Sequence, residues 1–261
     1  MNYEIRQEDK FRFIESQGGE ETLLLLHGLF GALSNFEGII RHFSGRMNVV
    51  VPMLPIFEMP IRQLSVAGLA EHVAELVAYK GYGKVHVLGN SLGGHIALLY
   101  AMAHPEQVKS IILTGSSGLF ESAMGTSFPK RGDYDFIKRK TEATFYSPGV
   151  ASKELVDEVY DIVNDRNKAI RIVATSKSAV RHNLGDNLHQ IKAPTLLIWG
   201  RQDNVTPAFV GEKFHELIEH SRLVFVEQCG HAPMMEHPDV FNEHLEKFLT
   251  EVNAAQFLPG K

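Results

Sequence analysis

Short apolar runs alternate along the chain with longer stretches in which apolar residues recur every three or four positions. The runs are too short for helices, and several are continuous rather than alternating with polar residues. That pattern is typical of strands buried on both faces of a parallel sheet. We predict such strands at Thr22–Leu26, Val49–Val51, Val85–Leu88, Ser110–Leu113, Thr195–Trp199 and Leu223–Val226.

The longer stretches have the periodicity of amphipathic helices. Apolar residues recur at helical spacing in Val66–Lys80, and Gly81 follows as a C-cap. Ser91–Ala103 is rich in Leu and Ala, and it ends before Pro105 because proline disfavours helical geometry in the residue before it. Two more helices are predicted at Val210–Ile218 and Pro238–Val252. This order predicts an α/β fold with a mostly parallel central sheet flanked by helices.

One segment breaks the alternation, because Leu119–Leu188 contains no run typical of a strand. It carries helical patterns at Tyr134–Lys140, Lys153–Asn164 and Lys168–Arg181. We therefore expect residues 119–188 to form a helical lid inserted between two strands. The core would then consist of residues 1–118 and 189–261.

Composition and charge narrow the class of protein. Hydrophobic residues make up 44% of the chain and charged residues 22%, which is ordinary for a globular protein. A net charge of -5 offers no basic face for nucleic acid. No apolar run approaches the ~20 residues that span a bilayer, and the first residues lack a signal-peptide core. We expect a cytoplasmic protein, monomer or dimer, that binds a small molecule and neither nucleic acid nor membrane.

The segment Gly89-Asn90-Ser91-Leu92-Gly93 matches the pattern G-x-S-x-G. It follows a predicted strand and begins a predicted helix, and this context gives the pattern its meaning. The serine would lie on a sharp turn at strained backbone angles, with glycines relieving the crowding. The helix N-terminus would place free N–H groups and a positive dipole end beside it. We predict that Ser91 is a catalytic nucleophile.

A serine hydroxyl needs a base to take its proton, and the base needs a carboxylate to fix its tautomer. His231 follows the last predicted strand, and Asp203 follows the strand before it. Both therefore lie at the same edge of the sheet as Ser91. Two alternatives were weighed: Asp203 as a simple turn residue, and Cys229 as a thiol nucleophile. Cys229 lies at the end of an apolar run, where a small buried residue is expected.

The reaction would also need two N–H donors for an oxyanion. Leu92, directly after the serine, would supply one. The loop His27-Gly28-Leu29-Phe30-Gly31 follows the first predicted strand, and its glycines allow close approach. Leu29 is the first choice for the second donor and Phe30 the second choice. His27 is expected to orient this loop through a hydrogen bond.

Together these motifs resemble the α/β-hydrolase superfamily over essentially the whole chain. The order Ser91, Asp203, His231 matches the order of its catalytic triad. The resemblance implies the α/β-hydrolase fold, with residues 119–188 as its helical lid. Asn90 and the segment Met235-Glu236-His237-Pro238 are most similar to small carboxylesterases and to meta-cleavage-product C–C hydrolases.

Three positions bear on the choice between these two activities. The C–C hydrolases have Trp after the catalytic His, whereas this chain has Ala232. They also hold the substrate carboxylate with a lid arginine, for which Arg181 is the candidate. Its alternative role is that of a solvated helix residue. Finally, Val51–Phe57 lacks the glycines of the loop that many relatives carry there, which would change the shape of the pocket.

The leading hypothesis is hydrolysis of a small or medium acyl ester through an acyl-enzyme, without metal or organic cofactor. The alternatives are C–C hydrolysis of a diketo acid and, less favoured, a non-catalytic binding module on the same fold. Residues expected to contact the substrate are Phe30, Asn90, Phe128, Phe136, Phe145 and Met234.

Overall fold

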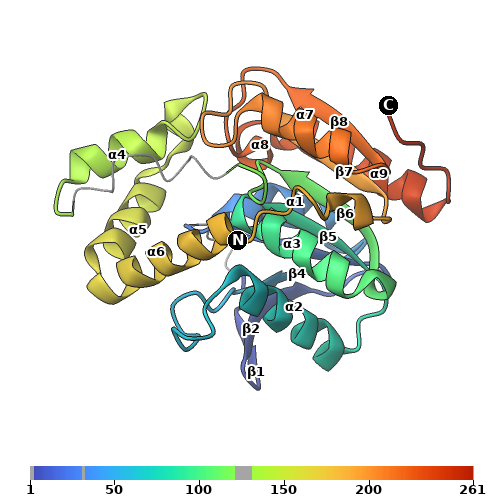
Figure 1. Ribbon diagram of the computed structural model, residues 1–261, viewed down its shortest axis with the longest axis horizontal. Helices are drawn as coiled ribbons and strands as arrows, with labels where there is room; N and C mark the ends of the chain where they lie inside the picture. Colours follow the sequence, from blue (N-terminus) through green and yellow to red (C-terminus); the bar gives the residue numbers. More distant parts are fainter. Residues whose placement is uncertain (1–2, 31–32, 121–130, 261) are drawn as a thin grey trace.

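The computed structural model describes residues 3–30, 33–120 and 131–260. Within these residues the strands form one eight-stranded sheet of order β1-β2-β4-β3-β5-β6-β7-β8 (Figure 1). The strands are β1 (Arg6–Glu8), β2 (Phe11–Ser16), β3 (Thr22–Leu26), β4 (Asn48–Pro52), β5 (Val85–Asn90), β6 (Val108–Thr114), β7 (Thr195–Gly200) and β8 (Ser221–Val226). From β4 to β8 neighbouring strands are parallel, whereas β1 and β2 form an antiparallel edge.

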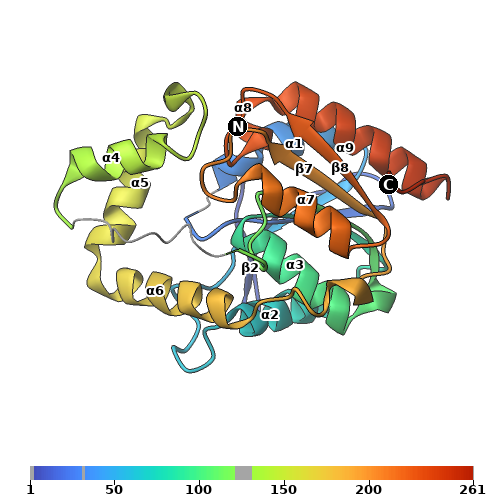
Figure 2. The same cartoon turned by 45° about the horizontal axis from the view of Figure 1, so that its top comes forward.

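The continuous apolar runs are the central strands, as predicted. Every residue of β3, β5 and β7 is buried, because helices cover both faces of a parallel sheet. The helices α2 (Val66–Lys80), α3 (Leu92–Ala103) and α7 (Ala208–Leu217) pack on one face. The helices α1 (Glu37–Phe43) and α9 (Pro238–Asn253) pack on the other, and Figure 2 shows the two layers. The predicted α/β class, a mostly parallel central sheet flanked by helices, is thereby confirmed.

The C-cap of α2 matches the sequence prediction, and the structure adds an N-cap. Its N-cap Ser65 accepts a hydrogen bond from Gly68 N at 3.0 Å. Gly81 follows the last residue with a left-handed φ of 65°, the conformation that favours glycine at a helix end. Helix and strand bounds elsewhere agree with the predicted ranges to within a few residues.

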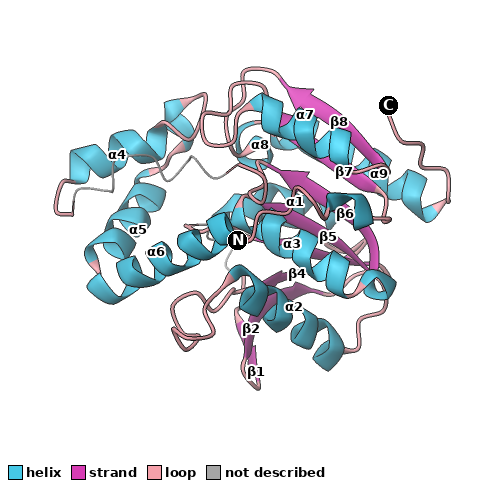
Figure 3. Cartoon of the chain, in the orientation of Figure 1, coloured by secondary structure: helices cyan, strands magenta, loops and turns pink. Residues whose placement is uncertain are grey.

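A set of helices lies between β6 and β7, where an insertion was expected. It contains α4 (Tyr134–Glu142), η4 (Pro148–Val150), α5 (Lys153–Asn164), α6 (Arg166–Arg181) and η5 (Leu188–Gln190). Figure 3 shows α4, α5 and α6 beside one end of the sheet rather than on either face. A Ser178 hydroxyl on α6 accepts a hydrogen bond from Val66 N at the start of α2, at 3.0 Å. The insertion is therefore joined to the core. Its interpretation as a helical lid inserted into the core stays a prediction.

Three features were absent from the sequence prediction: the β1–β2 hairpin, helix α1 and the short helix α8 (Pro233–Glu236). The hairpin did carry a signal, because Phe11 and Phe13 are 1% and 0% exposed while Arg12 between them is exposed. Such alternation is the period of a strand with one buried face. Among the described residues, no helix combines the length and apolar composition needed to cross a membrane.

Candidate active site

Ser91 occupies the sharp turn between the end of β5 and the start of α3. Its φ and ψ are 54° and −118°, a strained combination for a residue with a side chain. Both the N–H and the carbonyl group of Ser91 are hydrogen-bonded. Ser91 N donates to Thr114 O at 3.1 Å, and Ser91 O accepts from Ser117 N at 3.1 Å. The segment after β6 therefore fixes the strained backbone.

Close packing explains the glycine that follows this turn. A Cβ added to Gly93 would lie 1.9 Å from Leu26 O and 2.8 Å from His27 O. Both atoms are backbone atoms and cannot swing away. Glycine at position 93 thus lets the first turn of α3 press against the end of β3, which brings the loop after β3 beside Ser91.

Asp203 lies in the turn that follows β7, and its carboxylate is buried. Oδ1 accepts hydrogen bonds from Val205 N at 2.7 Å and Thr206 N at 2.9 Å. Oδ2 accepts from Thr206 Oγ1 at 2.9 Å. Trp199 Nε1 donates to Thr206 O at 2.8 Å, which ties the turn to the buried end of β7. These donors stabilise the ionised carboxylate and fix its direction.

His231 lies in the loop after β8, and its imidazole points at that carboxylate. Its Nδ1 is 2.9 Å from Asp203 Oδ2. Because an ionised carboxylate can only accept, Nδ1 carries the proton and Nε2 keeps its lone pair. The side chain of His231 is 12% exposed, whereas that of Asp203 is 0% exposed. Nδ1 of the imidazole is thus hydrogen-bonded to a buried carboxylate, whereas Nε2 is able to accept a proton.

The loops after β7 and β8 are fastened to one another. Gln202 N donates to Cys229 O at 2.9 Å, and Cys229 N donates to Gln202 Oε1 at 3.1 Å. Cys229 is fully buried, and this burial, reinforced by the nearby Glu236 carboxylate, raises the pKa of its thiol far above the ordinary range. A thiol held neutral in the interior is a poor nucleophile. The structure therefore favours the buried packing role that was expected for Cys229.

The side chain of Asn90 joins the serine turn to the histidine loop. Its Nδ2 donates to Thr114 O at 3.1 Å and to His231 O at 3.2 Å. Asn90 was expected to contact the substrate. In the structure it is 4% exposed and its amide nitrogen serves two backbone carbonyls. This link could not be predicted from local sequence, because it joins residues far apart in the chain.

His27 orients the loop after β3, as expected. Its Nε2 accepts a hydrogen bond from Leu54 N at 3.2 Å, so the proton lies on Nδ1, which donates to Gly28 O at 2.8 Å. Burial lowers the pKa of His27 and keeps the ring neutral. One imidazole thus connects the loops that follow β3 and β4.

The candidate oxyanion donors lie on either side of Ser91. Leu92 is the first residue of α3. A Cβ built on Gly28 would lie 3.3 Å from Ser91 Cβ, so the loop carrying Leu29 and Phe30 passes in contact with the serine. Leu29 packs against the core on the α2 and α3 face. Which amides bind an oxyanion stays a prediction.

The expected substrate-contacting residues lie in different surroundings. Phe145 and Met234 are 7% and 2% exposed and belong to the core on the α1 and α9 face. Phe136 is half-buried on α4, with Lys140 Nζ 5.8 Å from its ring centroid. Phe128 lies outside the described residues. Contact of these side chains with a substrate stays a prediction.

Two of the three arginines of α6, Arg171 and Arg181, differ in their surroundings. Arg181 is exposed at the last turn of α6, as a solvated helix residue would be. Arg171 is half-buried and donates to the backbone carbonyls of Ile56 and Met59. It therefore joins α6 to the segment after β4.

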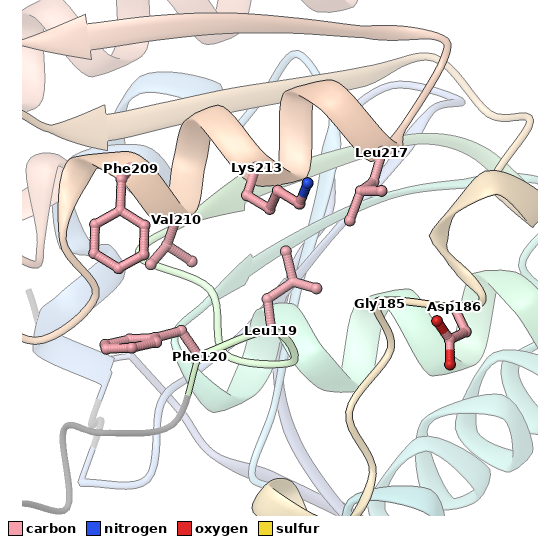
Figure 4. Close-up of a pocket in the computed structure, with 8 residues that line it drawn as sticks. All are labelled: Leu119, Phe120, Gly185, Asp186, Phe209, Val210, Lys213 and Leu217. Atoms are coloured by element: carbon pink, nitrogen blue, oxygen red, sulfur yellow. The ribbon is translucent and has the colours of Figure 1, made fainter.

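The cavity drawn in Figure 4 is separate from this constellation. It measures about 340 Å³ and lies between α7 and the segments around Leu119 and Asp186. Phe120 and Phe209 meet edge to face at its mouth, with centroids 5.2 Å apart. Ser91, Asp203 and His231 do not line it. This cavity is a groove flanking α7 and is not the candidate active site.

Comparison with known proteins places the fold and the motifs in one family. Residues 21–238 match the family model described as alpha/beta hydrolase fold. Lipase 1 of Psychrobacter immobilis is 27% identical over 90% of this chain and 78% of its own. A 2-hydroxy-6-oxononadienedioate/2-hydroxy-6-oxononatrienedioate hydrolase of Pseudomonas putida is 27% identical over 89% of each chain.

Solved structures agree with these relatives. An alpha/beta hydrolase enzyme from the metagenome of Mar Chica lagoon sediments, Morocco, is 41% identical, with a TM-score of 0.79 over 96% of this chain and 99% of its own. A membrane phospholipase A described as a bacterial virulence factor is 30% identical, with a TM-score of 0.83 over 97% and 86%. The chain belongs to the alpha/beta hydrolase fold family and is a hydrolase of that family.

Proposed function

We propose that this protein is a serine hydrolase that cleaves a small or medium carboxylic ester through an acyl-enzyme. Ser91 would be the nucleophile, His231 the base and Asp203 its carboxylate partner. The observation that carries the proposal is the 2.9 Å hydrogen bond between Asp203 Oδ2 and His231 Nδ1. It lies at the sheet edge where the strained Ser91 turn is held, and Asn90 links that turn to the His231 backbone.

In the first step Ser91 Oγ bonds to the ester carbonyl carbon while His231 Nε2 takes the hydroxyl proton. The carbonyl π electrons move to the carbonyl oxygen, which becomes an oxyanion. Asp203 stabilises the imidazolium that forms and keeps the ring in the productive tautomer. Backbone N–H groups of Leu92 and Leu29, or Phe30 in place of Leu29, would bind the oxyanion.

Collapse of this intermediate re-forms the carbonyl and breaks the bond to the alcohol oxygen. His231 gives its proton to that oxygen, so the alcohol leaves neutral and the acyl group stays on Ser91 Oγ. In the second half His231 Nε2 takes a proton from water while the water oxygen adds to the acyl carbon. The bond between that carbon and Ser91 Oγ then breaks, and His231 gives its proton to Ser91 Oγ. The acid is released and the enzyme returns to its starting state.

C–C hydrolysis of a diketo acid is the second candidate, supported by the similarity to the Pseudomonas putida hydrolase. Such a substrate carries carboxylate groups, and its pocket would need a cation. Arg181 is exposed at the end of α6, and Nη1 of Arg171 donates to two backbone carbonyls of the core. Ala232 follows His231 where the C–C hydrolases have tryptophan. These observations favour an ester.

A fluorophosphonate probe tests the nucleophile directly, because the serine oxygen displaces fluoride from phosphorus and stays phosphonylated. We expect the wild-type protein to gain one probe mass on the peptide containing Ser91, and Ser91→Ala to gain none. An unlabelled wild type, or equal labelling of both proteins, would contradict the proposal. Turnover of p-nitrophenyl esters of rising acyl length, beside one diketo acid, then decides between the two substrates.

A further inference from the structure

Glu236 connects three backbone amides from two parts of the chain. It is the last residue of the short helix α8 (Pro233–Glu236), just after the His231 loop. Its Oε1 accepts from Gly230 N at 2.6 Å. Its Oε2 accepts from Tyr146 N at 2.8 Å and Ser147 N at 3.2 Å. A half-buried carboxylate thus joins the insertion to the residue before His231.

The backbone of His231 is held by the same piece of the insertion. Its N–H donates to Thr144 O at 2.8 Å, while its carbonyl accepts from Asn90 on the opposite side. The peptide that carries the imidazole therefore lies between the serine turn and residues 144–147. A shift of those residues away from Gly230 would remove the acceptor of the His231 amide.

Gly230 shows how closely the two segments approach. A Cβ at position 230 would lie 2.6 Å from Thr144 O and 2.8 Å from Tyr146 N, both backbone atoms. The space between the insertion and the histidine loop is therefore already filled. This contact is formed by backbone groups. Among the contacts of the described residues, Glu236 is the side chain that hydrogen-bonds to both segments.

We propose that Glu236 is a positioning residue: by clamping residues 144–147 to Gly230 it fixes the backbone of His231 and thus the direction of the imidazole. The inference rests on the proposed function, in which His231 is the base. Glu236 acts through backbone amides and carries no proton in the reaction. Two carboxylate oxygens can accept from all three N–H groups, whereas glutamine would turn an NH₂ group toward some of them.

Glu236→Gln is the test variant, because it keeps size and shape and removes one acceptor. Glu227→Gln is its matched control, since Glu227 is an exposed carboxylate on the neighbouring loop that pairs only with Arg201 in the described contacts. Gly230→Ala disturbs the same contact, because the added Cβ would collide with the backbone of Thr144 and Tyr146. The Glu236 side chain itself is unchanged. The double variant Gly230→Ala/Glu236→Gln tests whether both act on one contact.

The readout is the rate of fluorophosphonate labelling, separated into the maximal rate and the half-saturating probe concentration. We expect Glu236→Gln to lower the maximal rate roughly tenfold to a hundredfold, because small displacements of a reacting group have effects of that size. The half-saturating concentration should stay within about twofold, since Glu236 touches no substrate. Gly230→Ala should act alike, and the double variant should lose less than the product of the two factors.

Amide hydrogen exchange provides the second readout. In Glu236→Gln the peptide covering residues 144–147 should exchange faster, while peptides from β5 stay protected. A role in overall stability would instead lower the melting temperature and leave the labelling rate unchanged at temperatures where the variant is folded. The Glu227→Gln control should match the wild type in both measurements.

Three results would overturn the inference: wild-type labelling rates in Glu236→Gln, an unchanged exchange rate at residues 144–147, or fully multiplicative losses in the double variant. Should Glu236→Gln fail to fold, Glu236→Asp, with a shorter carboxylate, is read by the same two measurements. Failure of the proposed function would look different, because the wild type itself would remain unlabelled. The exchange measurement still decides whether Glu236 clamps the two segments in that case.

Discussion

The two ends of the parallel strands each carry a histidine beside a carboxylate, and the two pairs differ in their surroundings. At the ends of β5, β7 and β8, His231 binds Asp203 at 2.9 Å beside Ser91. At the start of β5, His86 Nε2 lies 3.4 Å from Glu21 Oε2. A single strand, β5, thus has one pair near its beginning and the serine turn directly after its end.

The surroundings of the pair at the strand beginnings keep the His86 imidazole neutral and unreactive. His86 is completely buried, and its Nδ1 is 2.7 Å from the hydroxyl of Ser110 on β6. Burial lowers the pKa of His86 to about 4; Glu21 opposes this shift, and Lys109, 2.6 Å from Glu21, weakens that opposition. The Glu21 carboxylate also pairs with Lys109, so it does little to stabilise a protonated His86.

The difference teaches that residue type alone does not make a histidine a candidate catalytic base. Asp203 receives its hydrogen bonds from its own turn and directs one oxygen at His231, whose imidazole remains 12% exposed on the other side. His86 has no exposed atoms through which a substrate could reach it. Access to the imidazole and a neighbouring serine turn, rather than the carboxylate–imidazole pair itself, distinguish the two sites.

The largest expected contrast comes from neutralising the carboxylate in each pair. Asp203→Asn should lower the turnover rate about ten-thousandfold, because an amide NH₂ next to Nδ1 favours the wrong imidazole tautomer. Glu21→Gln should leave that rate within about twofold. Both rates are measured with the p-nitrophenyl ester that the wild type hydrolyses best. Equal losses of turnover rate in Asp203→Asn and Glu21→Gln would contradict the assigned difference between the two histidine–carboxylate pairs.

A smaller effect is expected in the pH dependence of stability. The folded pKa of His86 lies below its ordinary value of about 6.5, so the unfolded chain binds a proton that the folded chain refuses. Stability from this group is therefore complete above about pH 6.5 and is lost as the pH falls toward 4. The loss is on the order of 2 kcal/mol across this window.

His86→Gln should flatten that dependence, since glutamine does not titrate. The slope of unfolding free energy against pH, from urea titrations at several pH values between 6.5 and 4, should fall by up to one proton. The slope is informative even when the variant is less stable overall, because only its pH dependence is compared. A slope equal to the wild-type slope would show that His86 titrates normally in the folded state.

The smallest effect is expected from Lys109→Gln. Without the lysine, Glu21 acts on His86 unopposed and raises the pKa of the histidine toward its ordinary value. The acid-induced loss of stability should become shallower, while the free energy of unfolding at pH 7 changes by less than about 1 kcal/mol, as for other partly exposed pairs. The same urea titrations measure both quantities. A steeper loss at acid pH would reverse the assigned role of Lys109.

The position of the candidate residues could be predicted because topology alone brings them together. Ser91, Asp203 and His231 each follow a parallel strand, and the ends of such strands meet at one edge of the sheet. The identity and order of the strands followed from their continuous apolar runs. No alignment was needed for that step, only the period of the pattern and the rule for parallel connections.

What could not be predicted are links made through backbone groups. Asn90 was expected at the substrate, yet its amide holds the carbonyl of His231. Glu236 bears an ordinary surface-type side chain, and nothing local indicates that it binds amides of the insertion. Thr206 is a partial exception, because its hydrogen bonds to Asp203 are local. A hydroxyl residue three positions after a turn aspartate often donates to that carboxylate. Such contacts depend on how two distant loops finally pack.

Trp199 gives the chain an optical property that follows from its position. It is the only tryptophan in the sequence, it is buried in β7, and its indole nitrogen is bonded to the turn that holds Asp203. Intrinsic indole fluorescence of the whole protein therefore originates within a few residues of that carboxylate. The emission of the unlabelled protein should thus act as a built-in sensor of the order of this turn.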